Sequence, residues 1–167
     1  MQQQSPQGQA PRSTPGQGRP AADAAPAAVR RSREEVSSIF AEHGYLAVNK
    51  LGKQLGDTLA QQGATKSQVR NILNSFQAIA ETWDATAAGE RERQIARLKP
   101  NLVYLAARET NSTRKDLLSG LAETLGHGID GVLEEKLAED ERRRRYTALV
   151  DLVEAITAYH RVKARNE

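Results

Sequence analysis

The sequence predicts an all-α protein, a compact helical bundle of five to seven helices behind a disordered N-terminal tail. Two observations support this fold class. Beyond residue 30, apolar side chains recur every three or four residues, which is helical spacing. No stretch alternates apolar and polar residues as a half-buried strand would, and no hairpin turn joins β-branched runs. With 167 residues, the chain is long enough to bury one substantial core.

Residues 1–30 have a composition that differs from the rest of the chain. They contain five of the six prolines and six glutamines, and Met1 and Val29 are their only larger apolar side chains. Such a segment cannot bury enough apolar surface to offset the entropy lost on ordering. We therefore expect a disordered tail over residues 1–30 and a helical bundle domain over residues 31–167.

The overall basicity of the chain is a property of its N-terminal region. Residues 1–33 hold five of the 24 basic residues and one of the 21 acidic ones, which leaves 19 basic against 20 acidic residues in 34–167. A nearly neutral body can bind nucleic acid only if its charges are sorted onto one face. There is no cysteine, no apolar run of membrane-spanning length and no secretory signal. The prediction is a cytoplasmic protein without a membrane partner.

Helix starts are marked by capping residues. Ser32-Arg33-Glu34-Glu35 and Thr65-Lys66-Ser67-Gln68 both fit the capping box, and Asn111-Ser112-Thr113 is a turn that caps a later helix. Gly63 lies where a helix-terminating glycine is expected. The apolar stripes between these signals are Val36, Ile39 and Phe40; Val48, Leu51, Leu55 and Leu59; and Val69, Ile72, Leu73, Phe76, Ile79, Ala80 and Trp83.

The second half of the chain contains three predicted irregularities. We expect Ala88-Gly89 to close the helix that begins after Thr65. We also expect Lys99-Pro100 to break the chain between two helices, because proline usually stands at a helix start. The glycines at 126, 128 and 131 predict an interruption near His127. Residues expected to be buried here are Leu102, Val103, Leu105 and Ala106, then Leu118, Leu121, Leu125, Ile129 and Val132, and in the last helix Tyr146, Leu149, Val150, Val153, Ile156, Thr157 and His160.

The run Arg142-Arg143-Arg144-Arg145 is the most conspicuous cluster of charge. Consecutive helical residues point about 100° apart, so four arginines in a row cannot form one patch. Glu139, Asp140 and Glu141 each stand four residues before an arginine, which favours pairing along the helix. We interpret the run as structural.

Signatures of catalysis are missing from the sequence. His43, His127 and His160 are not spaced as metal ligands, and His160 continues an apolar stripe, as a hydrogen-bonded core histidine would. There is no glycine-rich phosphate loop and no nucleophile with a recognisable base. The prediction is a protein that is not an enzyme and has no cofactor and no metal site.

Four cations stand out because rigid backbone holds them. Lys66, Arg70, Lys99 and Arg108 each adjoin a helix start or a buried helix, and Arg108 shares a helix flank with Tyr104. Fixed cations suit a ligand with fixed anionic spacing, such as an RNA backbone. Lys50 and Lys53 lie off the apolar stripe of their helix, where a solvated pair is the commoner explanation. They complete the set of candidate cations.

Three blocks of sequence together resemble the small subunit of type III-A CRISPR effector (Csm) complexes. The blocks are Thr65-Lys66-Ser67-Gln68-Val69-Arg70-Asn71-Ile72-Leu73, Leu98-Lys99-Pro100-Asn101-Leu102-Val103-Tyr104-Leu105-Ala106-Ala107-Arg108, and Glu154-Ala155-Ile156-Thr157-Ala158-Tyr159-His160. Their order and spacing match that family from about residue 45 to 163. The tail and the glycines at 126–131 depart from the family pattern.

The resemblance implies a helical, non-catalytic subunit in antiviral defence. Several copies would stack along the guide RNA and target RNA, beside a backbone subunit and a large polymerase-like subunit. By motif position, RNA contact falls to Gln68, Arg70, Lys99 and Arg108, and Tyr104, Tyr159 and His160 would pack beside that surface. The RNA-binding residues predicted in all are Lys50, Lys53, Lys66, Gln68, Arg70, Lys99 and Arg108.

Two other functions are compatible with the sequence. One is a helical DNA-binding transcriptional regulator in which residues 65–83 form the recognition helix. The other is an assembly adaptor without nucleic-acid contact. Binding to duplex DNA, to single-stranded RNA or to neither would separate the three.

Overall fold

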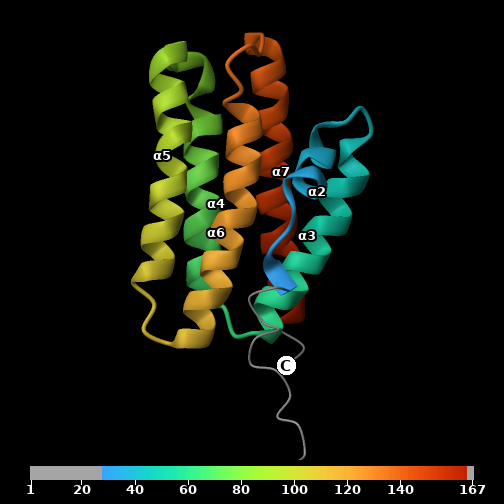
Figure 1. The fold of residues 1–167 in the computed structure, drawn as a ribbon, viewed down its shortest axis with the longest axis vertical. Helices are drawn as coiled ribbons and strands as arrows, with labels where there is room; N and C mark the ends of the chain where they lie inside the picture. The colour runs from blue at the N-terminus through green and yellow to red at the C-terminus, as the bar shows by residue number, and fades with distance from the viewer. Residues whose placement is uncertain (1–27, 165–167) are drawn as a thin grey trace, which may run out of the picture.

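A computed structural model describes residues 28–164, and it confirms the predicted all-α fold (Figure 1). The helices, in chain order, are α2 (Arg33–Ser37), the 3-10 helix η1 (Ser38–Phe40), α3 (Gly44–Gln61), α4 (Lys66–Glu81), the 3-10 helix η2 (Trp83–Ala85), α5 (Ala88–Ala107), α6 (Ser112–Val132) and α7 (Glu139–Lys163). No strand occurs in this part of the chain. None of its helices is long and apolar enough to cross a membrane.

The predicted tail lies outside the described residues except for its end. Residues 28–30 pack against α6: Val29 is buried, and its carbonyl accepts a 2.7 Å hydrogen bond from the Thr124 hydroxyl. Arg30 pairs with Glu123 on the same helix. The packed body therefore includes residues 28–30.

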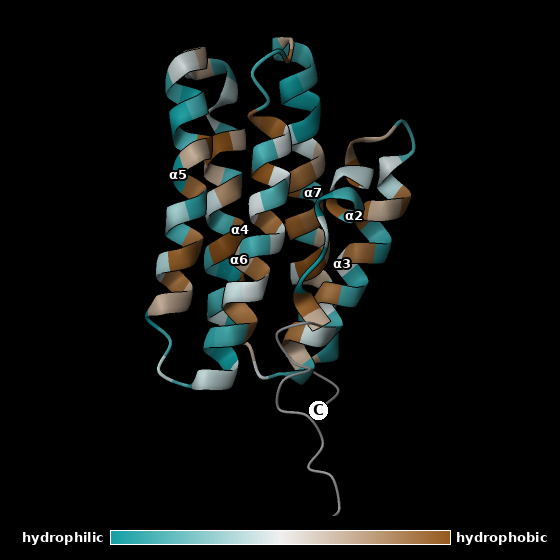
Figure 2. Ribbon diagram, in the orientation of Figure 1, coloured by the Kyte–Doolittle hydropathy of each residue, from teal (hydrophilic) through white to brown (hydrophobic). Residues whose placement is uncertain are grey.

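The long helices run side by side, with α7 in the middle of the arrangement (Figure 1). α7 packs against α3, α4 and α6, and α5 packs against α4 and α6. Each long helix carries both hydrophobic and hydrophilic residues, as the helices of an amphipathic bundle do (Figure 2). Tyr146 of α7 is fully buried, and its hydroxyl donates to the Phe76 carbonyl of α4 at 2.8 Å.

The predicted helix starts are confirmed by their caps. Ser32 and Thr65 each accept from the backbone N–H three residues later, and Glu35 and Gln68 return the bond. Asn111 caps α6 by accepting from the Arg114 N–H. Gly63 has φ +80°, the left-handed conformation expected of a glycine that ends a helix.

The predicted break at Lys99-Pro100 is wrong, because α5 continues through Pro100. Leu98 and Leu102, on either side of the proline, are buried and hold the helix against its neighbours. Pro100 and Ala96, whose carbonyl loses its helical partner, are both exposed. Water can satisfy that carbonyl, so packing outweighs the cost of the proline.

Two residues expected in the core are exposed. Val103 of α5 and Ala80 of α4 lie on the solvent side of their helices. The continuous α5 sets a single helical phase from Ile95 to Ala106, and in that phase Val103 points outward. A helix restarted at Pro100 would not have had this constraint.

The predicted closure of α4 at Ala88-Gly89 is also wrong, because α4 ends at Glu81 and Ala88 begins α5. The turn between them is held by Arg91. Its guanidinium lies 4.5 Å from the Trp83 ring centroid and donates to the carbonyls of Trp83 and Thr86 at 2.6 and 2.5 Å. Trp83 is buried as predicted, but in η2.

The predicted interruption near His127 does not occur, and α6 is continuous. Two of the three glycines lie where a side chain would collide with a neighbouring element. A Cβ on Gly128 would lie 2.6 Å from Leu149 Cδ1, and one on Gly131 would lie 2.6 Å from Phe40 Cε2. The local cost of glycine is offset by the close approach of α7 and η1.

Glycines also allow α3 to lie directly against α7. A Cβ on Gly52 would lie 2.4 Å from the Ala155 Cβ, and one on Gly56 would lie 2.6 Å from the Ile156 carbonyl oxygen. At the end of this contact His160 is fully buried, with Nε2 2.9 Å from the Ala64 carbonyl oxygen. The prediction of a hydrogen-bonded core histidine is confirmed, and Nε2 carries the proton of that bond.

Candidate nucleic-acid interface

The first turns of α4 carry two of the predicted cations. Lys66 and Arg70 are exposed, and the capping box of Thr65 fixes the helix start from which they project. They line a hollow of about 300 Å³ together with Ser67 of α4 and Arg161 near the end of α7. The three charged residues that line this hollow are all basic. The hollow therefore has the charge that a phosphate group requires.

Arg108 lies on the other side of α4, at the C-terminal end of α5. Its guanidinium carbon is 5.6 Å from the ring centroid of Tyr104, one helical turn earlier. The resemblance predicted Tyr104 as a packing residue, but its side chain is 63% exposed. Among residues 28–164, no carboxylate lies within ion-pair distance of Lys66, Arg70, Arg108 or Arg161. We call these four residues the basic end of the bundle.

Both hydrogen-bonding groups of the Gln68 side chain are engaged within the protein. Its Oε1 accepts from the Thr65 N–H at 2.8 Å, and its Nε2 donates to Glu109 at 2.6 Å. Glu109 also accepts from the Asn111 N–H and pairs with Arg114. The bond from the Asn111 N–H is the main cause of the lowered pKa of Glu109. In this structure Gln68 joins the start of α4 to the segment that follows α5.

Lys99 faces a different side of the bundle. Its Nζ lies 2.8 Å from Asp130 of α6, in a half-exposed ion pair. The hollow beside it contains Val103 and His127 and is separate from the one that Lys66 and Arg70 line. The structure therefore does not bring Lys99 together with the basic end.

Lys50 and Lys53 occupy α3, away from the other candidates. Lys53 donates to Asp57 at 2.6 Å, and this hydrogen bond raises the pKa of Lys53. Its Nζ also lies 5.5 Å from the Tyr159 ring. Lys50 borders a shallow hollow that also contains Glu35. The seven predicted residues thus fall on three surfaces, and the largest group, Lys66, Gln68, Arg70 and Arg108, lies at one end of the bundle.

The opposite end of the bundle contains Arg142-Arg143-Arg144-Arg145, and the structural interpretation of this run is confirmed. Arg142 is buried and pairs with Glu92 at 2.7 Å. Arg143 forms two hydrogen bonds to Asp84, at 2.7 and 3.0 Å. Arg144 and Arg145 both pair with Glu141. Of the predicted pairs four residues apart, only that of Glu141 with Arg145 forms.

Pairing changes the ionisation of this end. Hydrogen bonds from Arg144 and Arg145 lower the pKa of Glu141 to about 2. Arg144 also donates to the Phe40 carbonyl, and Arg145 to the Gly131 carbonyl. These guanidinium groups connect α7 to η1 and α6, and their charges are paired with carboxylates of the same protein. We call Arg142–Arg145 with their acidic partners the paired end.

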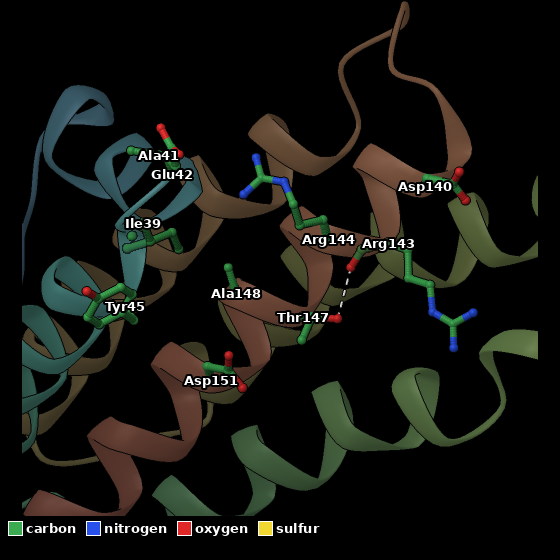
Figure 3. Close-up of a pocket in the computed structure, with 11 residues that line it drawn as sticks. Ile39, Ala41, Glu42, Tyr45, Asp140, Arg143, Arg144, Thr147, Ala148 and Asp151 are labelled. Carbon is green, nitrogen blue, oxygen red and sulfur yellow. Dashed lines mark hydrogen bonds between the residues drawn. The ribbon is translucent and has the colours of Figure 1, made fainter.

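Beside the paired end lies a larger hollow of about 500 Å³, between η1, the start of α3 and α7 (Figure 3). Arg143 and Arg144 point away from each other across it, as their spacing on the helix requires (Figure 3). Glu42, Asp140 and Asp151 share its lining, and burial raises the pKa of Asp151. Its mixed charge is unsuited to holding a row of phosphates.

Sequence reasoning did not include Arg161 among the candidate residues. It directly follows His160 in the third block of resemblance, but its closeness to Arg70 depends on how α7 crosses α4. Among the described residues, no group of three His, Cys, Asp or Glu side chains is placed to hold a metal ion.

Comparison with known proteins agrees with the resemblance. The family model described as Csm2 Type III-A matches residues 42–166, which is most of the chain. Neither the curated proteins nor the solved structures gave a match. The matched range contains α3 to α7 and every residue of the basic end. The chain belongs to the type III-A Csm2 family, the small subunit of a CRISPR effector complex.

Proposed function

We propose that this protein is the non-catalytic small subunit that stacks in several copies along the guide RNA and target RNA, in antiviral defence, and binds their backbone without sequence specificity. The basic end is the observation that supports this proposal. Its four cations flank the N-terminal half of α4, and within residues 28–164 none of them is paired with a carboxylate. Cations left free are those that can replace counterions on phosphates.

Roles differ among the predicted residues. Lys66, Arg70 and Arg108 contact phosphates, and Arg161 adds a fourth cation to the same end. Gln68 positions the helix start and reaches RNA only if it leaves Glu109. Lys50, Lys53 and Lys99 lie on other faces, where they would meet RNA only along an assembled stack.

Sequence-independent affinity is sufficient for such a subunit. In RNA-guided complexes, pairing between guide and target supplies the specificity. Repetition of the subunit along the RNA would multiply a modest affinity per copy. A body that is nearly neutral, with one basic end, fits this function better than a uniformly basic surface does.

The test is binding of the full chain to fluorescently labelled single-stranded RNA and to duplex DNA at low salt. We expect RNA binding that weakens as salt increases, and a loss of about three- to tenfold for Arg70→Ala. Arg143→Ala, which removes another exposed arginine from the paired end, is the matched control and leaves affinity unchanged. Preference for duplex DNA would favour a regulator, and affinity for neither ligand would favour an adaptor.

A further inference from the structure

A groove of about 210 Å³ runs between α4 and α5, next to the basic end. Its floor is apolar and is made by side chains of the core, among them Phe76 and Leu102. Its rim is polar, with the side-chain amides of Asn71 on α4 and Asn101 on α5. Tyr104 and Arg108 stand at its mouth. The groove thus combines an apolar interior with polar edges, as ligand pockets do.

The side chains of Tyr104 and Arg108, at the mouth of the groove, are exposed and have no evident role in holding the fold together. Tyr104 is 63% exposed, and within residues 28–164 its hydroxyl has no hydrogen-bond partner. The Arg108 guanidinium lies over its ring, 5.6 Å from the centroid. An aromatic face next to a guanidinium plane is the combination on which nucleobases stack.

The polar rim is also free. Within the same residues, no side-chain hydrogen bond involves the amide of Asn71 or that of Asn101. A carboxamide offers both donors and an acceptor, so it can meet the edge of any base. No carboxylate lines the groove, and its one charged residue is Arg108. This charge attracts an anionic ligand, and the adjoining Tyr104–Arg108 pair favours a base attached to a phosphate chain over an acidic peptide.

We propose that the groove between α4 and α5 holds one unpaired nucleobase of the bound RNA, stacked on Tyr104 and Arg108 and selected for its π-face and not for its identity. The inference rests on the proposed function, because the phosphates held at the basic end bring the strand to the groove. It adds a second kind of contact, which depends on the base and not on charge.

The experiment measures anisotropy of labelled single-stranded RNA with the full chain, using a normal oligonucleotide and one of the same length with abasic sites. We expect Tyr104→Ala to weaken binding of the normal RNA by about 5- to 150-fold, the range for loss of one stacked base. Tyr104→Phe retains the ring and stays near the parent. Val103→Ala is the matched control, because Val103 is its exposed neighbour in a different hollow.

Three readouts separate stacking from charge. Tyr104→Ala leaves the salt dependence of binding unchanged, and it causes no further loss with abasic RNA. RNA that carries 5-iodouridine crosslinks to Tyr104 in the parent chain. Circular dichroism confirms that each variant is folded.

The possible failures are distinct. If the parent binds no RNA at low salt, the proposed function fails and the inference fails with it. If the parent binds RNA with the expected salt dependence but Tyr104→Ala binds equally well, the inference alone is overturned. It is also overturned if Tyr104→Ala retains RNA affinity and loses assembly with the other subunits, because the groove is then a protein-docking site.

Discussion

The two ends of the bundle contain similar numbers of basic side chains and use them differently. At the paired end, Arg142–Arg145 are engaged by Glu92, Asp84 and Glu141. At the basic end, Lys66, Arg70, Arg108 and Arg161 have no carboxylate partner within the described residues. The comparison shows that a dense run of basic residues in the sequence can be consumed by ion pairs within the fold. Under the proposed function, a phosphate site is expected where charge is left over after the fold has paired its own ions.

The largest expected effect concerns the paired end. Arg142→Ala removes a buried guanidinium that donates to the Val132 and Glu134 carbonyls and pairs with Glu92. We expect a loss of about 2–4 kcal/mol in the free energy of unfolding, because buried acceptors lose their donor. Urea unfolding measures it. Under conditions where the variant is folded its RNA affinity equals that of the parent, and a selective loss of RNA binding would refute the division of roles.

The double variant Lys66→Ala/Arg70→Ala tests the basic end. Both side chains are exposed, so we expect the free energy of unfolding to change by less than about 0.5 kcal/mol. RNA affinity near physiological salt falls by about tenfold or more, because two phosphate contacts are lost. Anisotropy titration and urea unfolding on the same preparation check both statements. Unfolding of the variant would assign these residues to the fold.

Lys99→Ala sharpens the comparison, because Lys99 is a predicted RNA residue that the structure pairs with Asp130. A half-exposed ion pair contributes about 0–1 kcal/mol, so stability changes little. We expect the RNA affinity of the isolated chain to fall by less than that of Arg70→Ala. A larger loss for Lys99→Ala would place the main phosphate contacts on the α5–α6 side.

The smallest effect is a pH dependence at the paired end. Since Arg144 and Arg145 lower the pKa of Glu141 from 4.5 to about 2, its ionised form favours the folded state. This stabilisation is complete above the ordinary pKa and is lost as pH falls toward 2. Glu141→Gln removes it, so the variant loses less stability than the parent between pH 5 and pH 2. The free energy of unfolding of both proteins is measured by urea unfolding at pH 5 and at pH 2. An equal decrease for parent and variant between the two pH values would contradict this prediction.

Much of the fold could be predicted from the sequence because its signals are local. The caps at Ser32, Thr65 and Asn111 each act within four residues, and the buried stripes follow helical spacing. The errors arose where distant residues decide. Pro100 is tolerated because flanking leucines pack against other helices, and Gly128 leaves room for the side chain of Leu149.

The candidate site was predictable to a smaller extent. The neighbourhood of Lys66 and Arg70 follows from one helix start, so it was accessible from the sequence. The pairing of Lys99 with Asp130 and the approach of Arg161 to Arg70 depend on how separate helices cross. Exposure of Tyr104 follows from the phase of α5, whereas the packing role predicted for it came from the resemblance and not from helical spacing.

The salt dependence of RNA binding tests the central claim most directly. The logarithm of affinity is measured against the logarithm of salt concentration for the parent, for Lys66→Ala/Arg70→Ala/Arg108→Ala and for Arg143→Ala/Arg144→Ala. For single strands each lost phosphate contact reduces the slope by about 0.7, so we predict a reduction of about 2 for the triple variant. The slope of the paired-end variant stays that of the parent. Equal slopes for all three proteins, or a reduction confined to the paired-end variant, would contradict the account.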